Sequence, residues 1–351
     1  MALIVLIFYA FFSLVFLGLN YLFLWRTFSY FHLPYALAWS VAATLFFFVS
    51  NALQETLNNS FSFFLHKLAG IWLGIVWLGL FAIVLVELAR LIYPKASWGY
   101  VLIGIILILT GVALHTASSW VVFEHQMASE KITEQVRIVH LTDQHLHGAG
   151  AQEEFDTVID LVKPLKPDVV VITGDLFDAP GRPAADAFSS LQTLGAPVLF
   201  TIGNHEFYVG DDWTEKVMQN LGADVLRTKS TTVKGIQFLG IDDPTGGASM
   251  PTELEQLDLE DTFRVLLYHQ PDPIQPAVDN NIDLMLTGHT HAGQIFPFNL
   301  LVMLRYKYWK GLYTIGNTQL YVNPGTGTWM IPMRLGSRNT IGVFDIIPKG
   351  S

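Results

Sequence analysis

Four long apolar runs dominate the first third of the chain. They are free of Asp, Glu, Lys and Arg, and they cover residues 3–24, 33–53, 68–86 and 101–122. Each run reaches the roughly 18 residues that a helix needs to cross the hydrocarbon core of a bilayer. Core helices of a soluble protein would be separated by amphipathic segments, and none lies between these runs. The pattern therefore predicts an all-α bundle of four transmembrane helices within residues 1–123.

The pattern changes after residue 131, where short β-rich runs alternate with helical stretches and turn residues. Runs typical of strands cover residues 137–141, 168–172, 197–202, 236–241, 263–268 and 282–286. Helical stretches lie between them at residues 152–165, 184–194 and 212–221, with spacings that fit βαβ units. Residues 124–351 are therefore expected to form an α/β domain.

Composition agrees with this division into a membrane part and a soluble part. Hydrophobic residues make up 51% of the chain and charged residues only 14%, which is too apolar for an ordinary soluble protein. Residues 1–123 carry four basic and two acidic side chains, so the remainder of this chain of net charge −10 carries about −12. An acidic domain argues against nucleic-acid binding. Without cysteine, disulfides, thiolate metal sites and cysteine nucleophiles are excluded.

The basic residues between the apolar runs predict the orientation of the bundle. Loops one and three hold Arg26, Arg90 and Lys95, whereas loop two holds only Lys67. The positive-inside rule then places loops one and three in the cytosol. Because an even number of spans returns the chain to its starting side, the α/β domain is expected on the extracytoplasmic face of the cell membrane.

Polar residues of the kinds that bind metal ions follow the predicted strands at their carboxyl ends. Open α/β sheets place their ligands at this edge. A single Asp-x-His pair, or a single histidine at a strand end, is usually structural, but such groups at the ends of five strands are not expected by chance. Folding is therefore expected to gather one set of side chains: Asp143, His145, Asp175, Asn204, His205, His269, His289 and His291.

The spacing of these residues indicates which of them would bind the same metal ion. Residues two apart on extended backbone project to the same side, so Asp143 and His145 would share one metal. By the same spacing, His289 and His291 would reach an adjacent pair of metals. Carboxylate, carboxamide oxygen and imidazole, without thiolate, favour divalent ions such as manganese, iron or zinc.

The order of these groups resembles that of the calcineurin-like metallophosphoesterases. Their pattern is Asp-x-His, Gly-Asp, Gly-Asn-His-Asp/Glu, a lone His and Gly-His-x-His, and every element occurs in order within residues 136–345. The run Gly288-His-Thr-His-Ala-Gly-Gln294 is similar to the membrane-associated YkuE-type branch, although Ala292 stands where that branch usually has Gly. The resemblance implies a four-layer α/β/β/α sandwich that binds two divalent metal ions, with manganese the first candidate and iron or zinc the alternatives.

The resemblance also implies a role for each ligand. One metal would be held by Asp143, His145, Asp175 and His291, and the other by Asp175, Asn204, His269 and His289, so that Asp175 bridges them. Two cations so placed would bind a phosphate group and present a bridging hydroxide for in-line attack. His205, next to the ligand Asn204, would donate a proton to the leaving oxygen or steady the phosphoryl charge. His147 and Glu206 are expected to support the ligands rather than to react.

Residues 295–313, directly after the last metal motif, combine an apolar cluster with three cations. The cations Arg305, Lys307 and Lys310 alternate with aromatic residues in an otherwise acidic domain. This composition is typical of an element at a membrane surface, and a loop packed on its own domain is the alternative. We expect the segment to lie at the bilayer, where the three cations would bind the phosphate of a lipid-linked substrate.

The leading prediction is a membrane-bound phosphohydrolase that cleaves phosphoester or pyrophosphate bonds of a lipid-linked substrate. With a cytosolic domain instead, the resemblance would allow a UDP-diacylglucosamine pyrophosphohydrolase of lipid A synthesis. A non-catalytic, metal-bearing membrane scaffold would lack ligands, and none is missing here. A transporter or channel would place ionisable residues inside the spans, where only His115 occurs. The sequence predicts no particular oligomeric state.

Overall fold

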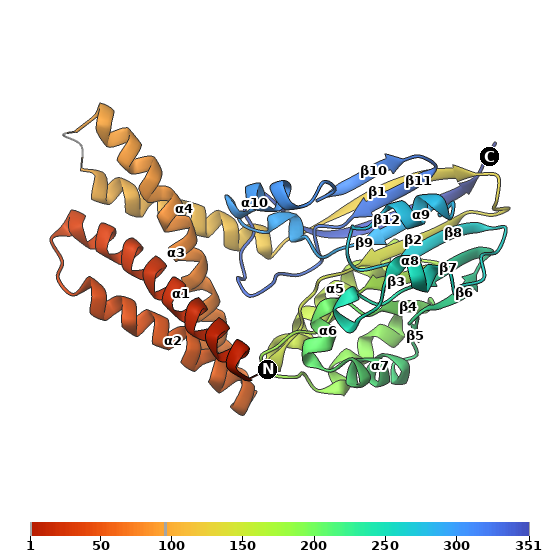
Figure 1. Cartoon of the computed structure of the whole chain (residues 1–351), viewed down its shortest axis with the longest axis horizontal. Coiled ribbons are helices and arrows are strands. Elements are labelled where there is room, and N and C mark those ends of the chain that lie inside the picture. Colours follow the sequence, from red (N-terminus) through yellow and green to blue (C-terminus); the bar gives the residue numbers. More distant parts are fainter. Residues whose placement is uncertain (1, 95–96, 351) are drawn as a thin grey trace.

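The first part of the chain is helical. The computed structural model describes residues 2–94 and 97–350, and within them four helices are long and apolar enough to cross a membrane. These are α1 (Ala2–Phe31), α2 (Ala36–Leu57), α3 (Ser60–Ile92) and α4 (Trp98–Ala117), which form one group beside the remainder of the molecule (Figure 1). The predicted bundle of four apolar helices is confirmed. Lys95, one of the residues used to predict its orientation, lies outside the described residues.

The fourth helix ends earlier than its apolar run predicts. It ends at Ala117, and residues 120–122, which we assigned to the span, begin the strand β1 (Trp120–Ser129). The reason for the error is that a short apolar run with β-branched residues has the same hydropathy in a strand as in a helix. The predicted domain boundary after residue 123 therefore falls inside β1.

The described residues after α4 form two six-stranded sheets. The first sheet has the order β1-β12-β2-β3-β4-β5, and the second has the order β10-β11-β9-β8-β7-β6. The other strands of the first sheet are β2 (Val136–Leu141), β3 (Val169–Thr173), β4 (Val198–Thr201), β5 (Asp224–Val225) and β12 (Asn339–Pro348). Those of the second sheet are β6 (Lys229–Val233), β7 (Ile236–Gly240), β8 (Phe263–Leu267), β9 (Leu284–Thr287), β10 (Gly311–Ile315) and β11 (Thr318–Val322).

The two sheets pack face to face, and helices cover their outer faces. In β3, Val169 and Val171 contribute to the core between the sheets, whereas Val170 and Ile172 contribute to the core beneath the outer helices. Because successive side chains of a strand point to opposite faces, a strand buried on both faces is apolar throughout. The result is the predicted four-layer α/β/β/α sandwich.

Helices occupy most of the positions that the pattern predicts. The outer helices are α5 (Ala151–Val162), α7 (Asp211–Asn220), α8 (Met250–Leu254) and α9 (Gln275–Asp279), and two further helices, α6 (Asn204–Val209) and α10 (Phe298–Arg305), lie near the polar strand ends. The predicted helix at residues 184–194 is a 3-10 helix, Ala185–Leu194.

The membrane helices and the sandwich share an extensive seam. Gly70 and Gly74 of α3 let the loop of residues 327–336 approach closely, because a Cβ at Gly70 would lie 2.5 Å from the carbonyl oxygen of Met330. The backbone N–H of Arg334 in that loop donates to the carbonyl of Ala113 in α4 at 2.9 Å. At the turn between α2 and α3, Asn58 donates to the carbonyl of Arg182 at 2.7 Å. The sandwich therefore contacts the ends of α2 and α4 and the part of α3 around Gly70 and Gly74 (Figure 1).

Candidate metal centre

The predicted ligands come together at the carboxyl edges of both sheets. Asp143 and His145 follow β2, Asp175 follows β3, and Asn204 begins α6 directly after β4. The second sheet contributes three histidines, His269 after β8 and His289 and His291 after β9. Three overlapping groups hold potential ligand atoms within 4.8 Å of one another: Asp143–His145–His291, His145–Asp175–His205 and Asp175–His269–His289. The structure thus gathers the predicted residues, including His205, into one cluster.

The backbone beneath these residues is not extended, so the geometric reason given from the spacing is wrong. Asp143 and His145 both have φ near 53°, and Asp175, His289 and His291 also lie in the left-handed region. Such conformations cost non-glycine residues about 1–3 kcal/mol each and concentrate at functional sites. Asp143 and His145 meet because two left-handed residues turn the loop after β2 back toward the cluster.

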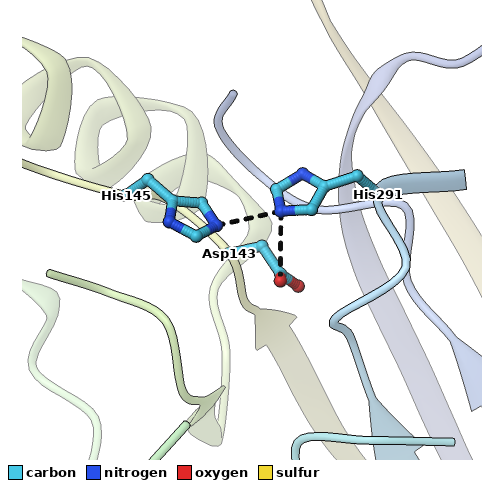
Figure 2. A group of neighbouring side chains, drawn as sticks. All are labelled: Asp143, His145 and His291. Carbon is cyan, nitrogen blue, oxygen red and sulfur yellow. Dashed lines mark hydrogen bonds and ion pairs between the residues drawn. The ribbon is translucent and has the colours of Figure 1, made fainter. Parts of the chain in front are cut away.

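The first group consists of Asp143, His145 and His291, all of them buried. Figure 2 shows the two imidazole rings facing each other above the carboxylate, with the Nε2 atoms 2.9 Å apart and Nε2 of His291 3.4 Å from Oδ1 of Asp143. Two lone pairs that face each other at this distance need a proton or a cation between them. The donor set therefore fits a divalent cation.

The second group is built around Asp175, His269 and His289. Nε2 of His269 lies 3.1 Å from Oδ2 of Asp175 and 3.2 Å from Nδ1 of His289, which is also 3.0 Å from Oδ1 of Asn204. The same Oδ2 of Asp175 is 3.8 Å from Nε2 of His145 in the first group. Asp175 thus lies between the two groups, where the resemblance places a bridging ligand.

The electrostatics of three ligands also fit metal binding. Burial, together with the charges of His145 and Arg334, holds the pKa of His291 well below its ordinary value. Burial and the neighbouring His269 lower the pKa of His289 to about 4. Burial opposes the charge on Asp175, but nearby histidines outweigh it and keep the pKa of that carboxyl low. Neutral imidazole and ionised carboxylate are the forms that bind a divalent cation. Two other ligands favour their protonated forms: burial raises the pKa of Asp143, and burial opposes the charge on His269, but the charges of Asp175 and Asp143 outweigh burial and raise the pKa of that imidazole.

Hydrogen bonds fix the orientation of several ligands from outside the cluster. Nδ1 of His145 lies 3.1 Å from Oδ2 of Asp178, and Nδ1 of His269 donates to the carbonyl of Thr173 at 2.8 Å. Partners of this kind set the tautomer and the direction of a ligand imidazole. Asp178 was missed from the sequence, where the only signal was a second carboxylate three residues after Asp175.

Glu206 lies beneath the cluster rather than in it. Its buried carboxylate accepts four backbone hydrogen bonds, from Asp175 at 2.9 Å, Leu176 at 2.8 Å, Phe177 at 3.1 Å and Gly203 at 2.8 Å. Burial and the charge of Asp175 raise the pKa of Glu206 to about 7, although these N–H donors favour its ionised form. The side chain ties the loop after β3 to the loop after β4.

His205 occupies the less buried side of the cluster, as do Asn204 and His289. Its Nδ1 lies 2.7 Å from Oδ1 of Asp178, and its Nε2 is 4.0 Å from Oδ2 of Asp175. Burial lowers the pKa of His205, but the hydrogen bond to Asp178 and the charges of both carboxylates outweigh burial and raise it to about 9. At this position the His205 imidazole could act either as a proton donor or as a further metal ligand.

The remaining predicted residues lie around the cluster. His147 contacts the carbonyl oxygen of His145 through Nδ1 at 3.0 Å. The cations Arg305, Lys307 and Lys310 are exposed, and each lies over the ring of an adjacent aromatic residue, 4.4 to 5.0 Å from its centroid. The structure therefore places these three cations outside the metal cluster, with Arg305 at the end of α10 and both lysines on the segment that follows.

Comparisons with known proteins agree with the fold and the cluster. The family model for calcineurin-like phosphoesterases matches residues 136–293. YkuE, a metallophosphoesterase of Bacillus subtilis, is 32% identical over 241 residues, which cover 64% of this chain and 84% of that protein. The chain therefore belongs to the calcineurin-like metallophosphoesterases, a family of metal-dependent phosphoester hydrolases.

Two further relatives are similar over a smaller share of their own length. A transmembrane protein with a metallophosphoesterase domain from Danio rerio is 35% identical over 247 residues, covering 63% of this chain and 56% of that protein. A metallophosphoesterase of Helicobacter pylori is 34% identical over 230 residues, covering 63% of this chain and 62% of that protein. Together with the four apolar helices, the first of these indicates a membrane protein.

Proposed function

We propose that this chain is a membrane-bound, dinuclear-metal phosphohydrolase that cleaves a phosphoester or pyrophosphate bond in a lipid-linked substrate. The supporting observation is the position of α10, which joins the metal cluster to the apolar part of the membrane helices. Phe298 of α10 contacts Trp77 of α3, with ring centroids 6.0 Å apart, and Phe296 contacts Phe81 at 4.9 Å.

Trp77 and Phe81 both lie well inside the apolar stretch of α3. Trp77 is nine residues beyond the start of that stretch at residue 68, and nine residues of helix extend roughly 14 Å. The outer face of α10 is nevertheless uncovered, since Leu300 is 49%, Leu301 52% and Leu304 85% exposed. An apolar face beside a membrane span is the arrangement of a helix that dips into the bilayer.

The same segment reaches the open side of the cluster. The hydroxyl of Tyr306, directly after α10, lies 3.0 Å from Nε2 of His289, and Thr290 donates to the carbonyl of Trp309 at 2.7 Å. A lipid bound along α10 would therefore carry its phosphate toward His289. Arg305, Lys307 and Lys310 would attract that phosphate as it approaches.

The side chains of the cluster have different proposed roles in catalysis. Asp143, His145, Asp175 and His291 would hold one cation, and Asp175, Asn204, His269 and His289 the other, with manganese proposed as the native ion. Such cations, when bound, supply positive charge that stabilises a phosphoryl group under in-line attack. His205 is oriented through Nδ1 by Asp178, which leaves Nε2 to protonate the leaving oxygen.

The proposed lipid substrate predicts a selective loss in a variant of α10. Replacing Leu300, Leu301 and Leu304 by Ser should lower hydrolysis of lipid phosphates in vesicles at least about tenfold, because each exposed leucine contributes roughly 1–2 kcal/mol to burial in the bilayer. Hydrolysis of a small chromogenic phosphoester with manganese should change less than about twofold. The matched control replaces the same residues by Met, which keeps the apolar surface. Equal losses on both substrates would contradict a lipid-guiding role for α10.

The role of His205 predicts a separation of catalysis from metal binding. His205→Ala should keep the metal content of the purified protein near normal and lower kcat by about 10²- to 10⁴-fold, the usual contribution of a general acid. Metal content by plasma mass spectrometry and kcat on the small phosphoester would be measured on one preparation. A parallel loss of metal would instead make His205 a ligand.

The proposed side of the membrane can be tested with reporters at the carboxyl terminus. Arg26 and Arg90 lie near the helix ends opposite the sandwich, where both bond Glu87. With these ends in the cytosol, a fused alkaline phosphatase should be active in intact cells and a fused green fluorescent protein should stay dark. The reverse result would place the metal cluster in the cytosol. It would then favour UDP-diacylglucosamine as the substrate.

A further inference from the structure

We propose that a cavity in the seam between the membrane helices and the sandwich binds a second lipid, whose headgroup carries both a phosphate and a primary ammonium. The cavity has a volume of about 420 Å³ and lies behind the loop that carries Asp143 and His145. Gln144, between those two residues, lines it. A volume of this size is within the range of small-molecule sites, roughly 300–1,000 Å³.

The walls of the cavity come from both parts of the molecule. Leu114 and Ala117 from the last turn of α4 and Phe63 from the first turn of α3 form its membrane side. Glu153 and Glu154 from the first turn of α5 form the side that belongs to the sandwich. A space bounded by the end of a membrane helix and by charged residues lies at the level of lipid headgroups.

A buried polar group in the cavity wall lacks a hydrogen-bond partner within the part of the chain that the structure describes. Gln144 is only 4% exposed, and its side-chain oxygen has no hydrogen-bond partner among the described residues. A buried carbonyl oxygen without a donor is unfavourable, and native structures usually supply one. The missing partner is a hydrogen-bond donor. Because this oxygen has less than 1 Å² of accessible surface, an ammonium group in the cavity reaches it once the Gln144 amide has turned toward the cavity.

The charges around the cavity complement a zwitterionic headgroup. Lys67 lies 3.5 Å from Glu154, whereas the carboxylate of Glu153 forms no ion pair with any described residue. One cation and two carboxylates can bind a phosphate and an ammonium together. A primary ammonium can donate hydrogen bonds to Glu153 and Gln144, whereas a quaternary ammonium cannot. The acyl chains would follow the lipid-facing side of α4 beside Leu114.

The test uses the full-length protein, delipidated in detergent and titrated with dioleoyl phosphatidylethanolamine, phosphatidylcholine or phosphatidylglycerol. Native mass spectrometry should show at least about tenfold tighter binding of the ethanolamine lipid than of the other two. The double variant Lys67→Gln/Glu153→Gln should reduce this preference to less than about twofold. Glu255→Gln, which removes an exposed carboxylate of the sandwich, is the matched control and should retain the preference.

Two further arms distinguish lipid binding in this cavity from lipid binding at the metal cluster and from capture of a headgroup alone. Removing metal with EDTA should leave the preference intact, because the cavity lies behind the metal loop; loss of the preference would place the lipid at the metal cluster. Soluble glycerophosphoethanolamine should bind at least about 100-fold more weakly, since it lacks acyl chains. Equal binding of the three lipids, equal binding of the soluble compound, or an unchanged preference in the double variant would each overturn the proposal.

Discussion

Asp175→Asn is expected to remove most of the bound metal and to lower kcat/KM on any phosphoester at least about 1000-fold. The reason is the position of this carboxylate between the two groups, with Oδ2 3.1 Å from His269 and 3.8 Å from His145. A carboxamide has no charge to offer two cations, and its amino group would face ligand nitrogens. Metal content and kinetics on a small phosphoester would be measured together.

A matched variant separates this effect from a general loss of folding. Asp224→Asn changes an exposed carboxylate at the start of β5 and should leave metal content and activity unchanged. Thermal unfolding of both variants in the absence of metal reports on the fold alone. If Asp175→Asn kept two metals per chain and near-normal turnover, the assignment of Asp175 as a shared ligand would be wrong.

Glu206→Gln is expected to destabilise the protein and the metal cluster together. The carboxylate accepts four backbone N–H groups, and the amide would turn an NH₂ group toward two of these donors. Two lost hydrogen bonds to a buried charge lower the free energy of unfolding by about 3 kcal/mol or more. The metal-free protein should therefore unfold at a clearly lower temperature, and its affinity for manganese should fall because the loop of Asp175 loses its support.

Glu255→Gln provides the control for this substitution, because its side chain is exposed on the sandwich. It should shift the unfolding temperature by no more than the error of measurement. A Glu206→Gln variant as stable as the parent, but without activity, would instead give Glu206 a direct part in the reaction. A loss of stability with manganese affinity unchanged would show that the loop keeps its shape without this side chain.

The sequence predicted the location of the site better than its local geometry. Asp143, His145 and Asp175 could be placed together because the ends of β2 and β3 share one edge of the first sheet, a rule that needs only strand positions. His291 follows β9 of the second sheet, so its place beside them came from the resemblance. The left-handed backbone beneath them is set by contacts with other loops, such as the close approach of Gly288 to Asp143, and no short-range pattern encodes it. Their assignment as metal ligands stays a prediction until metal is measured.

Residues that support the site were harder to find than those that form it. Asp178 looks like a turn residue, and its two histidine partners are distant in sequence. Arg334 is fully buried and donates to the carbonyl of Gly327 at 2.6 Å and to that of Pro324 at 2.8 Å, yet the sequence places it in a polar loop. Their roles depend on the tertiary packing of loops, which hydrophobic periodicity does not describe.

The prediction of the fold from the sequence was also incomplete. The inner strands β2, β3 and β4 were predicted because their sequences are short runs rich in apolar and β-branched residues. The edge strand β1 was missed because it begins as an apparent continuation of a membrane span, and β12, which lies between β1 and β2, was missed as well. The seam could not be predicted either, because it depends on two glycines of α3 and on the loop of residues 327–336 meeting in space.

The pairing of β1 with β12 has a consequence for the order of biosynthesis. β12 lies between β1 and β2 in the first sheet and pairs with β1 in parallel from Trp120 opposite Asn339 to Ser129 opposite Pro348. These partners are separated by more than 200 residues in sequence, so the first sheet cannot be completed until residue 348 has left the ribosome. Membrane insertion of the amino-terminal helices therefore precedes closure of the sandwich, and the bilayer already anchors the nascent domain while it folds.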